Sequence, residues 1–212
     1  MFDIEYKGAN CLVITTKGLT IVTDPKLSLV GLKDQPVKER LVVATEDRFV
    51  VDDGSTRLVV SGPGEYEVGP VAIIGKLVTR HIDTPDQPKQ STMYRMEIGD
   101  IRLGIVGNIA PDLSEDDLEA LGVIDILIIP VGGTGYTLDS TNATKLVRKI
   151  EPKVIIPVHY QDKGLNYEVP QEGLDLFIKE MGVEVENTAK YKVKAATSIP
   201  ATMTIVELER SN

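Results

Sequence analysis

The stretch IDILIIPVGGTGYTLDSTNATKLVRKIEPKVIIPVHY, residues 124–160, decides the fold class of this chain. It holds two apolar runs, IDILIIPV (124–131) and VIIPV (154–158), which are typical of strands covered on both faces. The segment between them has the pattern of a helix. Strand, helix and strand in this order predict an α/β protein whose helices lie outside buried sheets.

Three helices are predicted in the second half of the chain. One lies near residues 140–150 and is capped by Asp139 or Ser140. A second is opened by Ser114-Glu115-Asp116-Asp117, which resembles a capping box because a serine and an acid three residues later satisfy each other's backbone N–H groups. This helix is predicted to reach Leu121 before Gly122, and a third is predicted from Pro170 to Gly182.

Short β-rich runs dominate the first half, and they predict an antiparallel sheet that starts as a meander. The predicted strands cover residues 2–6, 11–16, 19–24, 40–45, 56–61, 70–79, 91–98 and 101–107, with a final strand at 202–209. The stretches 83–90 and 161–170 are predicted loops. Because no linker separates the two halves, we expect a single domain over residues 1–212.

Composition and charge exclude several classes of protein. The formal net charge is −9 and the sequence pI is near 4.8, so the surface repels phosphate backbones and we expect no nucleic-acid partner. Lys190, Lys192 and Lys194 recur with a period of two, which predicts the exposed face of a strand rather than a basic patch. The single cysteine, Cys11, excludes an internal disulfide and an all-cysteine metal cluster. With no secretory leader pattern and no apolar run of bilayer length, we expect a cytoplasmic protein without membrane contact.

Polar residues follow four of the predicted strands, where sites in α/β proteins tend to lie. They are Asp24, Asn108, the glycine-rich loop after Val131, and His159. Each can be a ligand or a hydrogen-bond anchor for the next loop, and together they indicate a shared cleft. Gly132, Gly133 and Gly135 can form a backbone nest for an anion or a simple strand-to-helix turn. They are not a Walker motif, since no Gly-Lys-Ser/Thr follows.

The segments YKGANCLVI, IVTDPKL, VVSGPGEYEVG and IPVGGTGYTLDSTNATKLVRKIEPKVIIPVHY occur in this order along the chain. Their order and spacing resemble the metallo-β-lactamase superfamily, in particular its branch of ascorbate-6-phosphate lactonase-like, predicted zinc-dependent hydrolases. The resemblance covers residues 1–185, and GPGEYEVG and the PVGG to PVHY segment are its most specific parts. It implies an α/β fold of the four-layer αββα sandwich type, with two mixed β-sheets, helices outside, and an active site along one edge of the sheets.

In that family a strand ends in Thr/Ser-His-x-His-x-Asp-His, which supplies half of the ligands for one or two divalent metals. Two cations a few ångströms apart need several imidazoles and a shared carboxylate. Here the segment reads VVATEDRFVVDDG, and aligned on Thr45 the ligand positions hold Glu46, Arg48, Val50 and Val51. Arginine is a permanent cation and valine has no donor atom, so most of the dinuclear ligand set is missing.

Two histidines and two other polar residues match further positions of the family's site. His81 matches the third ligating histidine and His159 the last one, and in the family these serve different metals. Asn108 takes the place of the bridging aspartate and carries no charge to offset two dications. Asp24 matches a carboxylate that orients a ligating histidine, although that histidine is absent here.

These observations favour a hydrolase-like protein with a degenerate metal site, which acts as a non-catalytic binding or scaffold protein and needs no cofactor. Arg48 would supply charge and backbone N–H groups would supply geometry, so the residual cleft suits a small anionic ligand. The residues expected in this cleft are Arg48, His81, Asn108, Gly132, Gly133, Gly135 and His159. A homo-oligomer is compatible with this interpretation.

The alternative is an active hydrolase of the lactonase-like branch, with His159 as the candidate catalytic residue. It would hold one zinc ion through His81, His159 and a carboxylate, or it would use His159 as a general base without metal. The candidate carboxylates are Glu46, Asp24, Asp47, Asp52 and Asp53. Nucleic-acid processing, known from other branches, is disfavoured because the added domain and a positive surface are missing. An ordinary strand-end histidine remains the structural explanation of His159.

Overall fold

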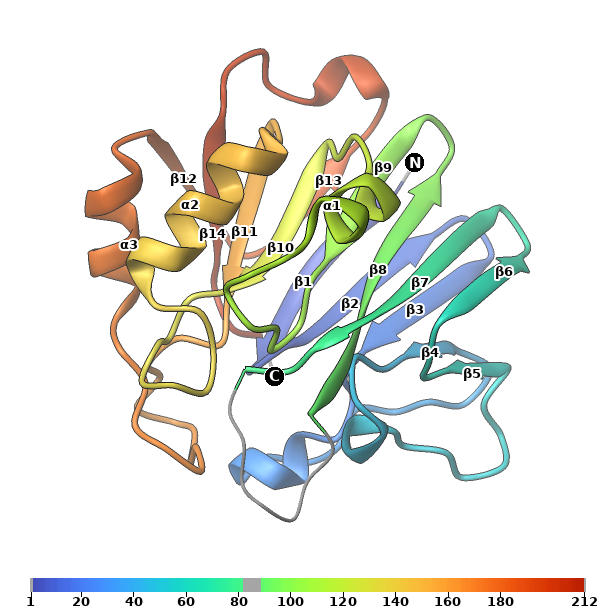
Figure 1. The fold of residues 1–212 in the computed structure, drawn as a ribbon. Coiled ribbons are helices and arrows are strands. Elements are labelled where there is room, and N and C mark those ends of the chain that lie inside the picture. Colours follow the sequence, from blue (N-terminus) through green and yellow to red (C-terminus); the bar gives the residue numbers. More distant parts are fainter. Residues whose placement is uncertain (1, 82–88, 212) are drawn as a thin grey trace.

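The computed structural model describes residues 2–81 and 89–211, and the strands of this part form two sheets that pack face to face (Figure 1). The smaller sheet has the order β13-β1-β2-β3-β4-β5 and the larger one β12-β14-β11-β10-β9-β8-β7-β6. Both sheets are mixed, because antiparallel hairpins adjoin parallel strands in each. Two mixed sheets with helices outside confirm the predicted fold class. Most of the predicted loop 83–90 lies outside the described residues.

The smaller sheet contains β1 (Phe2–Gly8), β2 (Cys11–Thr16), β3 (Leu19–Thr23), β4 (Leu41–Val43), β5 (Leu58–Val60) and β13 (Tyr191–Val193). The larger sheet contains β6 (Gly64–Val68), β7 (Val71–Thr79), β8 (Gln90–Ile98), β9 (Ile101–Ile105), β10 (Ile126–Pro130), β11 (Val154–Val158), β12 (Glu184–Thr188) and β14 (Thr204–Leu208). The α-helices are α1 (Glu115–Leu121), α2 (Ser140–Ile150) and α3 (Leu174–Met181). The 3₁₀ helices are η1 (Leu27–Val30), η2 (Asp47–Phe49) and η3 (Ala196–Ser198).

The main core lies between the sheets, where buried side chains from both inner faces meet, among them Ile14 of β2 and Tyr94 of β8. On the outer face of the larger sheet, α2 and α3 pack a second apolar cluster that includes Phe177. The outer face of the smaller sheet is covered by η1 and by Leu165, above the buried Cys11. The outer layer is therefore helical on one side and reduced to a 3₁₀ turn and a loop on the other.

The prediction of an antiparallel first half is wrong at one end of the smaller sheet. Strand β4 pairs parallel with both β3 and β5. The connections 24–40 and 44–57 are long enough for the chain to cross back before each parallel strand, whereas a two-residue turn would enforce an antiparallel pair. Apolar alternation does not encode strand direction, so the sequence pattern could not reveal this.

The third helix begins at Leu174, after Gly173, and not at the predicted Pro170. Backbone groups of the intervening residues bond elsewhere: the Pro170 carbonyl accepts from the Thr134 hydroxyl, and the Glu172 N–H donates to the Gly132 carbonyl at 2.7 Å. Tertiary contacts with the glycine-rich loop therefore replace the first helical turn. Strands β6 (GEYEV) and β12 (EVENT) were not predicted, because each is short and contains few apolar residues between exposed acidic ones. In β6 the alternation of a half-buried strand is nevertheless present, since Val68 is buried in the core and Tyr66 packs against it.

The predicted caps of the first two helices and the predicted alternation around Lys192 are confirmed. Ser114 and Asp117 form the capping box of α1, and the Asp139 side chain, not that of Ser140, accepts from the Asn142 N–H at 2.7 Å. Tyr191 and Val193 are buried while Lys192 between them is exposed, as the period of two predicted. Across residues 2–81 and 89–211, no helix is both long and apolar enough to span a membrane.

Candidate functional site

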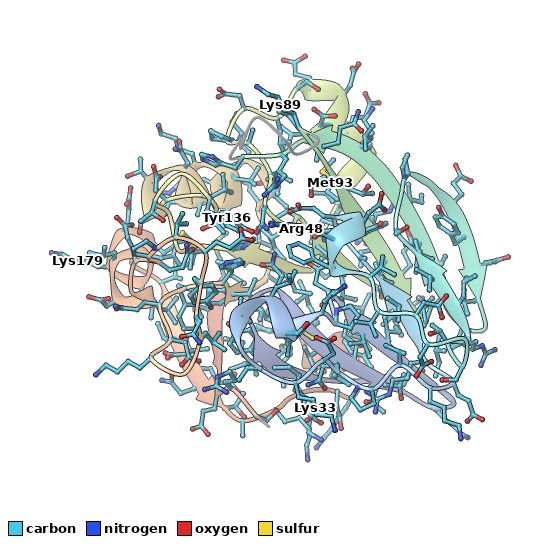
Figure 2. All side chains as sticks on the ribbon, turned by 90° about the horizontal axis from the view of Figure 1, so that it is seen from below. Lys33, Arg48, Lys89, Met93, Tyr136 and Lys179 are labelled. Atoms are coloured by element: carbon cyan, nitrogen blue, oxygen red, sulfur yellow. The ribbon has the colours of Figure 1, made fainter. Side chains whose placement is uncertain are left out.

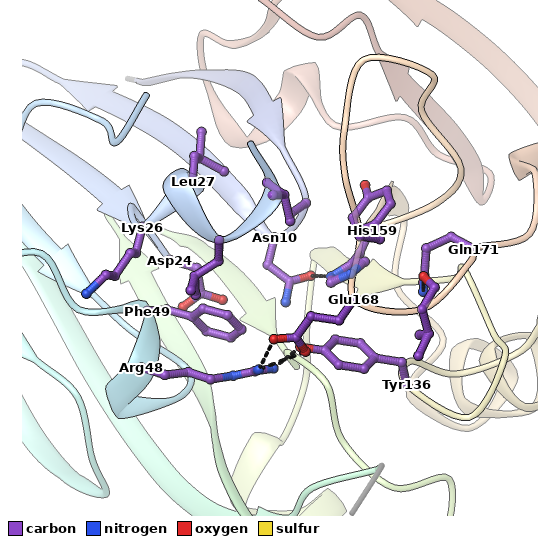
Figure 3. A pocket seen from close by; sticks show the side chains of 15 residues that line it. Asn10, Asp24, Lys26, Leu27, Arg48, Phe49, Tyr136, His159, Glu168 and Gln171 are labelled. Carbon is purple, nitrogen blue, oxygen red and sulfur yellow. Dashed lines mark hydrogen bonds and ion pairs between the residues drawn. The ribbon is translucent and has the colours of Figure 1, made fainter. Parts of the chain in front are cut away.

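A row of four polar side chains connects the two sheets where several strands end, and Figure 3 shows two of them, Asn10 and His159. Asn10 follows β1 and Glu46 follows β4 in the smaller sheet, while Asn108 follows β9 and His159 follows β11 in the larger one. The order of contact is His159, Asn10, Asn108, Glu46, and we call these residues the polar row. The convergence of strand-end residues predicted for Asn108 and His159 is therefore present.

The polar row has a fixed hydrogen-bond direction. Asn108 Nδ2 donates to Glu46 Oε1 at 3.0 Å, because a carboxylate only accepts. Asn108 therefore turns its oxygen to Asn10, whose Nδ2 donates to it at 2.9 Å, and the Asn10 oxygen faces His159 Nδ1 at 3.1 Å. His159 Nδ1 must carry the proton, which leaves the lone pair on Nε2.

Glu46 is buried between two guanidinium groups. Its Oε2 accepts from Arg48 Nε at 2.9 Å and lies 3.0 Å from Arg80 Nε. The Glu46 and Arg80 side chains are only 6% and 3% exposed. Burial raises the pKa of Glu46 above its ordinary value, while Arg48 and Arg80 oppose this rise. Because two permanent cations face it, Glu46 is an ionised partner of the arginines and not a free carboxylate.

Besides Glu46, Arg48 contacts three further groups. Its guanidinium lies over the Phe49 ring at 4.6 Å, and its NH2 group donates to the Tyr136 hydroxyl. Its NH1 group donates to both carboxylate oxygens of Glu168, at 3.2 and 3.4 Å. Every side of the Arg48 guanidinium therefore has a partner.

His159 is buried and neutral. Its ring stacks on Tyr167 with the centroids 4.8 Å apart, and its backbone N–H donates to the Ala9 carbonyl at 2.9 Å. Burial, and secondarily the charge of Arg48, lowers the pKa of His159 to about 3. Its backbone adopts φ +50°, a left-handed conformation that is uncommon for residues other than glycine. Among the described residues Nε2 has no hydrogen-bond partner, so the lone pair remains on the side away from Asn10.

Asp24 lies near the polar row but bonds to a different residue. Its two carboxylate oxygens accept from the Thr45 N–H and the Thr45 hydroxyl, each at 2.7 Å. Burial raises the pKa of Asp24 to about 7, although the two bonds from Thr45 lower it. Asp24 therefore joins the ends of β3 and β4 and, within the described part of the chain, makes no hydrogen bond with the imidazole of His159.

The glycine-rich loop is a tightly packed turn. A Cβ on Gly132 would overlap the Gln171 side chain and the His159 carbonyl, and one on Gly133 would lie 2.9 Å from a Glu172 oxygen. The Gly133 N–H already donates to the Leu138 carbonyl at 3.1 Å. Gly133 and Gly135 adopt positive φ, as the turn requires. The packing supports the strand-to-helix turn more than an anion nest.

We expect Gly132→Ala to lower the free energy of unfolding by about 1–3 kcal/mol, because the added methyl group must displace backbone of the His159 segment. Urea denaturation measures this loss. Gly62→Ala is the matched control, since a Cβ there meets open space, and it is expected to change stability by less than about 0.5 kcal/mol. Equal stabilities of the two variants would contradict the tight packing inferred for this loop.

The residual cleft predicted from the sequence is divided in the structure. One cavity, the His159 cavity, has a volume of about 30 Å³ (Figure 3). A second, more open pocket of about 510 Å³ is lined by Arg48, Arg80 and Glu46, among other residues. Arg48 lines both, whereas His81 and the three glycines line neither, and Asn108 is fully buried behind them.

His81 is placed next to the polar row only through its backbone, since its N–H donates to the Asn108 carbonyl at 2.8 Å. The side chain is partly exposed, and it takes no part in the polar row within residues 2–81 and 89–211. The structure thus brings Arg48, Asn108, His159 and Glu46 together and leaves the His81 imidazole outside this group.

The residues at this site do not fit the dinuclear metal centre that the fold implies. Glu46 is already paired with two arginines, Asn108 supplies an amide where a bridging carboxylate is needed, and Arg48 adds a fixed positive charge. Within the described ranges, no three histidine, cysteine, aspartate or glutamate side chains gather closely enough to hold a metal ion. A pair of dications here would meet two guanidinium groups and one carboxylate.

Sequence reasoning did not identify several residues of the site. Asn10 lies in the short turn between β1 and β2, and Arg80 directly precedes His81, so neither residue stands out in the sequence. Tyr136, Tyr167 and Glu168 lie in loops whose side chains have no periodic pattern. One feature of the sequence could have identified Arg80. It directly follows the long strand β7, and an arginine buried there needs a partner of opposite charge.

Comparison with known proteins gives the same family as the sequence motifs. A UPF0173 protein of Pyrococcus abyssi is 26% identical over 180 residues, which cover 76% of this chain and 84% of that protein. A UPF0173 metal-dependent hydrolase of Thermoplasma acidophilum is 43% identical over 47 residues, 21% of this chain and 20% of that protein. A Thermotoga maritima structure, provisionally described as a Zn-dependent hydrolase of the metallo-beta-lactamase superfamily, has the same fold, with a TM-score of 0.76 and 24% sequence identity. The match covers 99% of this chain and 100% of that one. A model of the beta-lactamase superfamily domain matches residues 3–159, and the chain therefore belongs to the beta-lactamase superfamily.

Proposed function

We propose that this chain is a beta-lactamase superfamily protein that binds a small anionic ligand at Arg48 without a dinuclear metal centre. The observation that carries the proposal is the pairing of Glu46 with both Arg48 and Arg80, at the position where the family places metal ligands. A carboxylate held by two guanidinium groups would have to give up both ion pairs to bind a metal ion. The positive charge at this site is instead supplied by the two arginine side chains, which are permanently charged.

The electrostatics of the buried part favour an anion. Arg48 and Arg80 are permanent cations that both face Glu46, and His159 is neutral. The molecule as a whole carries a net charge of −9, so a small anion is attracted by the charge of Arg48, where it replaces Glu168, and not by the overall field. Arg48 is the member of the pair that reaches both cavities.

A metal-dependent hydrolase is the second candidate. It is supported by the names of relatives such as the Thermoplasma acidophilum protein, and by the neutral imidazole of His159, whose Nε2 lone pair suits a metal ligand or a general base. In this alternative, zinc would bind through His159 and a carboxylate that first leaves its arginine partners, with His81 drawn toward the site.

Metal content distinguishes the two candidates. Protein purified without chelator is expected to contain less than about one tenth of a zinc equivalent per chain by elemental analysis, because a site with one or two donors does not retain the ion. The melting temperature is also expected to be unchanged by chelator or by added zinc, since binding to the folded state alone would raise it. Near-stoichiometric metal, or a chelator-sensitive melting temperature, would favour the hydrolase.

A further inference from the structure

We infer that the ligand of this site is a small monocarboxylate with a short apolar body, and that Glu168 of the chain itself occupies the ligand's anchoring position on Arg48. The inference rests on the proposed anion-binding function and names its ligand class. It starts from the bidentate contact of the Glu168 carboxylate with Arg48 NH1 at the wall of the His159 cavity (Figure 3).

The Arg48 guanidinium is held in place without Glu168. On its buried side, the Arg48 Nε–H donates to the Glu46 carboxylate. Phe49 lies against the face of the guanidinium group, and the Tyr136 hydroxyl accepts from NH2. These partners belong to buried or partly buried segments, so the NH1 edge keeps its direction when Glu168 moves away. A preorganised guanidinium edge of this kind is a typical carboxylate anchor.

Among the partners of Arg48 in the described part of the chain, Glu168 is the exposed one. Its side chain is 49% exposed, compared with 20% for Arg48. The loop around it is anchored by other residues: the Gln161 N–H donates to the Glu172 carbonyl at 2.8 Å, and the Asn166 N–H donates to the Val30 carbonyl at 2.9 Å. The Glu168 carboxylate can therefore leave Arg48 by rotation of its side chain, without opening the loop. Until it leaves, the Glu168 carboxylate competes with a ligand carboxylate for Arg48, and its high local concentration favours Glu168 because it is part of the same chain.

The walls of the cavity indicate the rest of the ligand. The residues around the Arg48 edge include apolar side chains, namely Leu27, Leu29, Val30, Phe49 and Val169. The present free space of about 30 Å³ is enough for one or two water molecules, so a ligand enters only where the Glu168 side chain withdraws. The Glu46 carboxylate already lies on the same cation, which disfavours a doubly charged phosphate relative to a singly charged carboxylate.

Butyrate titration tests the inference. The Arg48 Nε–Hε signal is followed by NMR in the wild-type protein, in Glu168→Gln and in Glu119→Gln, an exposed residue of α1 with the same charge change. We expect Glu168→Gln to bind butyrate about 1.5-fold to fivefold more tightly than the wild type, which corresponds to the free energy of an exposed ion pair, and Glu119→Gln to match the wild type. Butyramide, which lacks the charge, is expected not to shift the signal.

The possible outcomes separate the two proposals. If butyrate and inorganic phosphate both fail to shift the Arg48 signal in any of the three proteins, the anion-binding function itself is overturned. If butyrate binds the wild type and Glu168→Gln equally, or if Glu119→Gln gains the same affinity, the competing role of Glu168 is wrong while anion binding stands. Tighter binding of phosphate than of butyrate would overturn the assignment to carboxylates.

Discussion

Replacing Glu46 with glutamine is expected to lower the free energy of unfolding by about 3–5 kcal/mol, as measured by urea denaturation near neutral pH. The change removes one negative charge and keeps the volume of the side chain. It removes the ion pair between Glu46 and Arg80, whose side chain is 3% exposed, and the ion pair between Glu46 and Arg48. It also reverses the hydrogen-bond direction of the polar row if the glutamine presents its amide nitrogen to Asn108.

Two further variants control this prediction. Asp47→Asn removes the same charge from the next residue, which is exposed, and is expected to cost less than about 0.5 kcal/mol. Adding Arg80→Met to Glu46→Gln is expected to recover part of the lost stability, because it removes a buried cation that no longer has its ion pair with residue 46. A loss of less than about 1 kcal/mol in Glu46→Gln alone would show that the two arginines do not depend on Glu46.

The second large effect is a dependence of stability on pH that comes from Asp24. Its pKa is about 7 in the folded protein and near 3.8 in the unfolded chain, so between these values the folded state keeps a proton that the unfolded state releases. The contribution is fully present below pH 3.8 and is lost as the pH rises through 7. Its full size is about 4 kcal/mol. The stability of the wild type relative to Asp24→Asn should therefore fall by up to this amount between pH 4 and pH 7, and then stay level.

His159 must be separated from this effect, because its slope is opposite. Its folded pKa of about 3 lies below the ordinary value of 6.5, so the unfolded chain takes up a proton first and stability falls as the pH drops below 6.5. In the wild type the two slopes partly cancel between pH 4 and pH 6.5. Denaturant unfolding of Asp24→Asn and His159→Gln over this range should reveal difference curves of opposite sign. A flat Asp24→Asn difference curve would mean that Asp24 is ionised in the folded protein at all these pH values.

The fold class was predictable because its signals are local. The apolar runs at 126–130 and 154–158, the cap at Asp139 and the capping box at Ser114 depend on neighbouring residues only. The parallel pairing of β4 was not predictable in the same way, since strand direction depends on how long connections cross the sheet. The start of α3 was also not predictable from local signals. This helix begins at Leu174 because the preceding residues pack on the glycine-rich loop.

The sequence by itself determined which metal-ligating atoms are available in this protein. Arg48, Val50 and Val51 stand at ligand positions of the resembled family, and no fold of the chain makes these side chains metal ligands. Only the tertiary structure decided what Glu46 and His159 do. Their partners Arg48, Arg80, Asn108 and Asn10 come from different strand ends of two sheets. Hydrogen bonds and ion pairs act over about 3 Å, so their pattern follows from how the sheets pack and not from spacing along the chain.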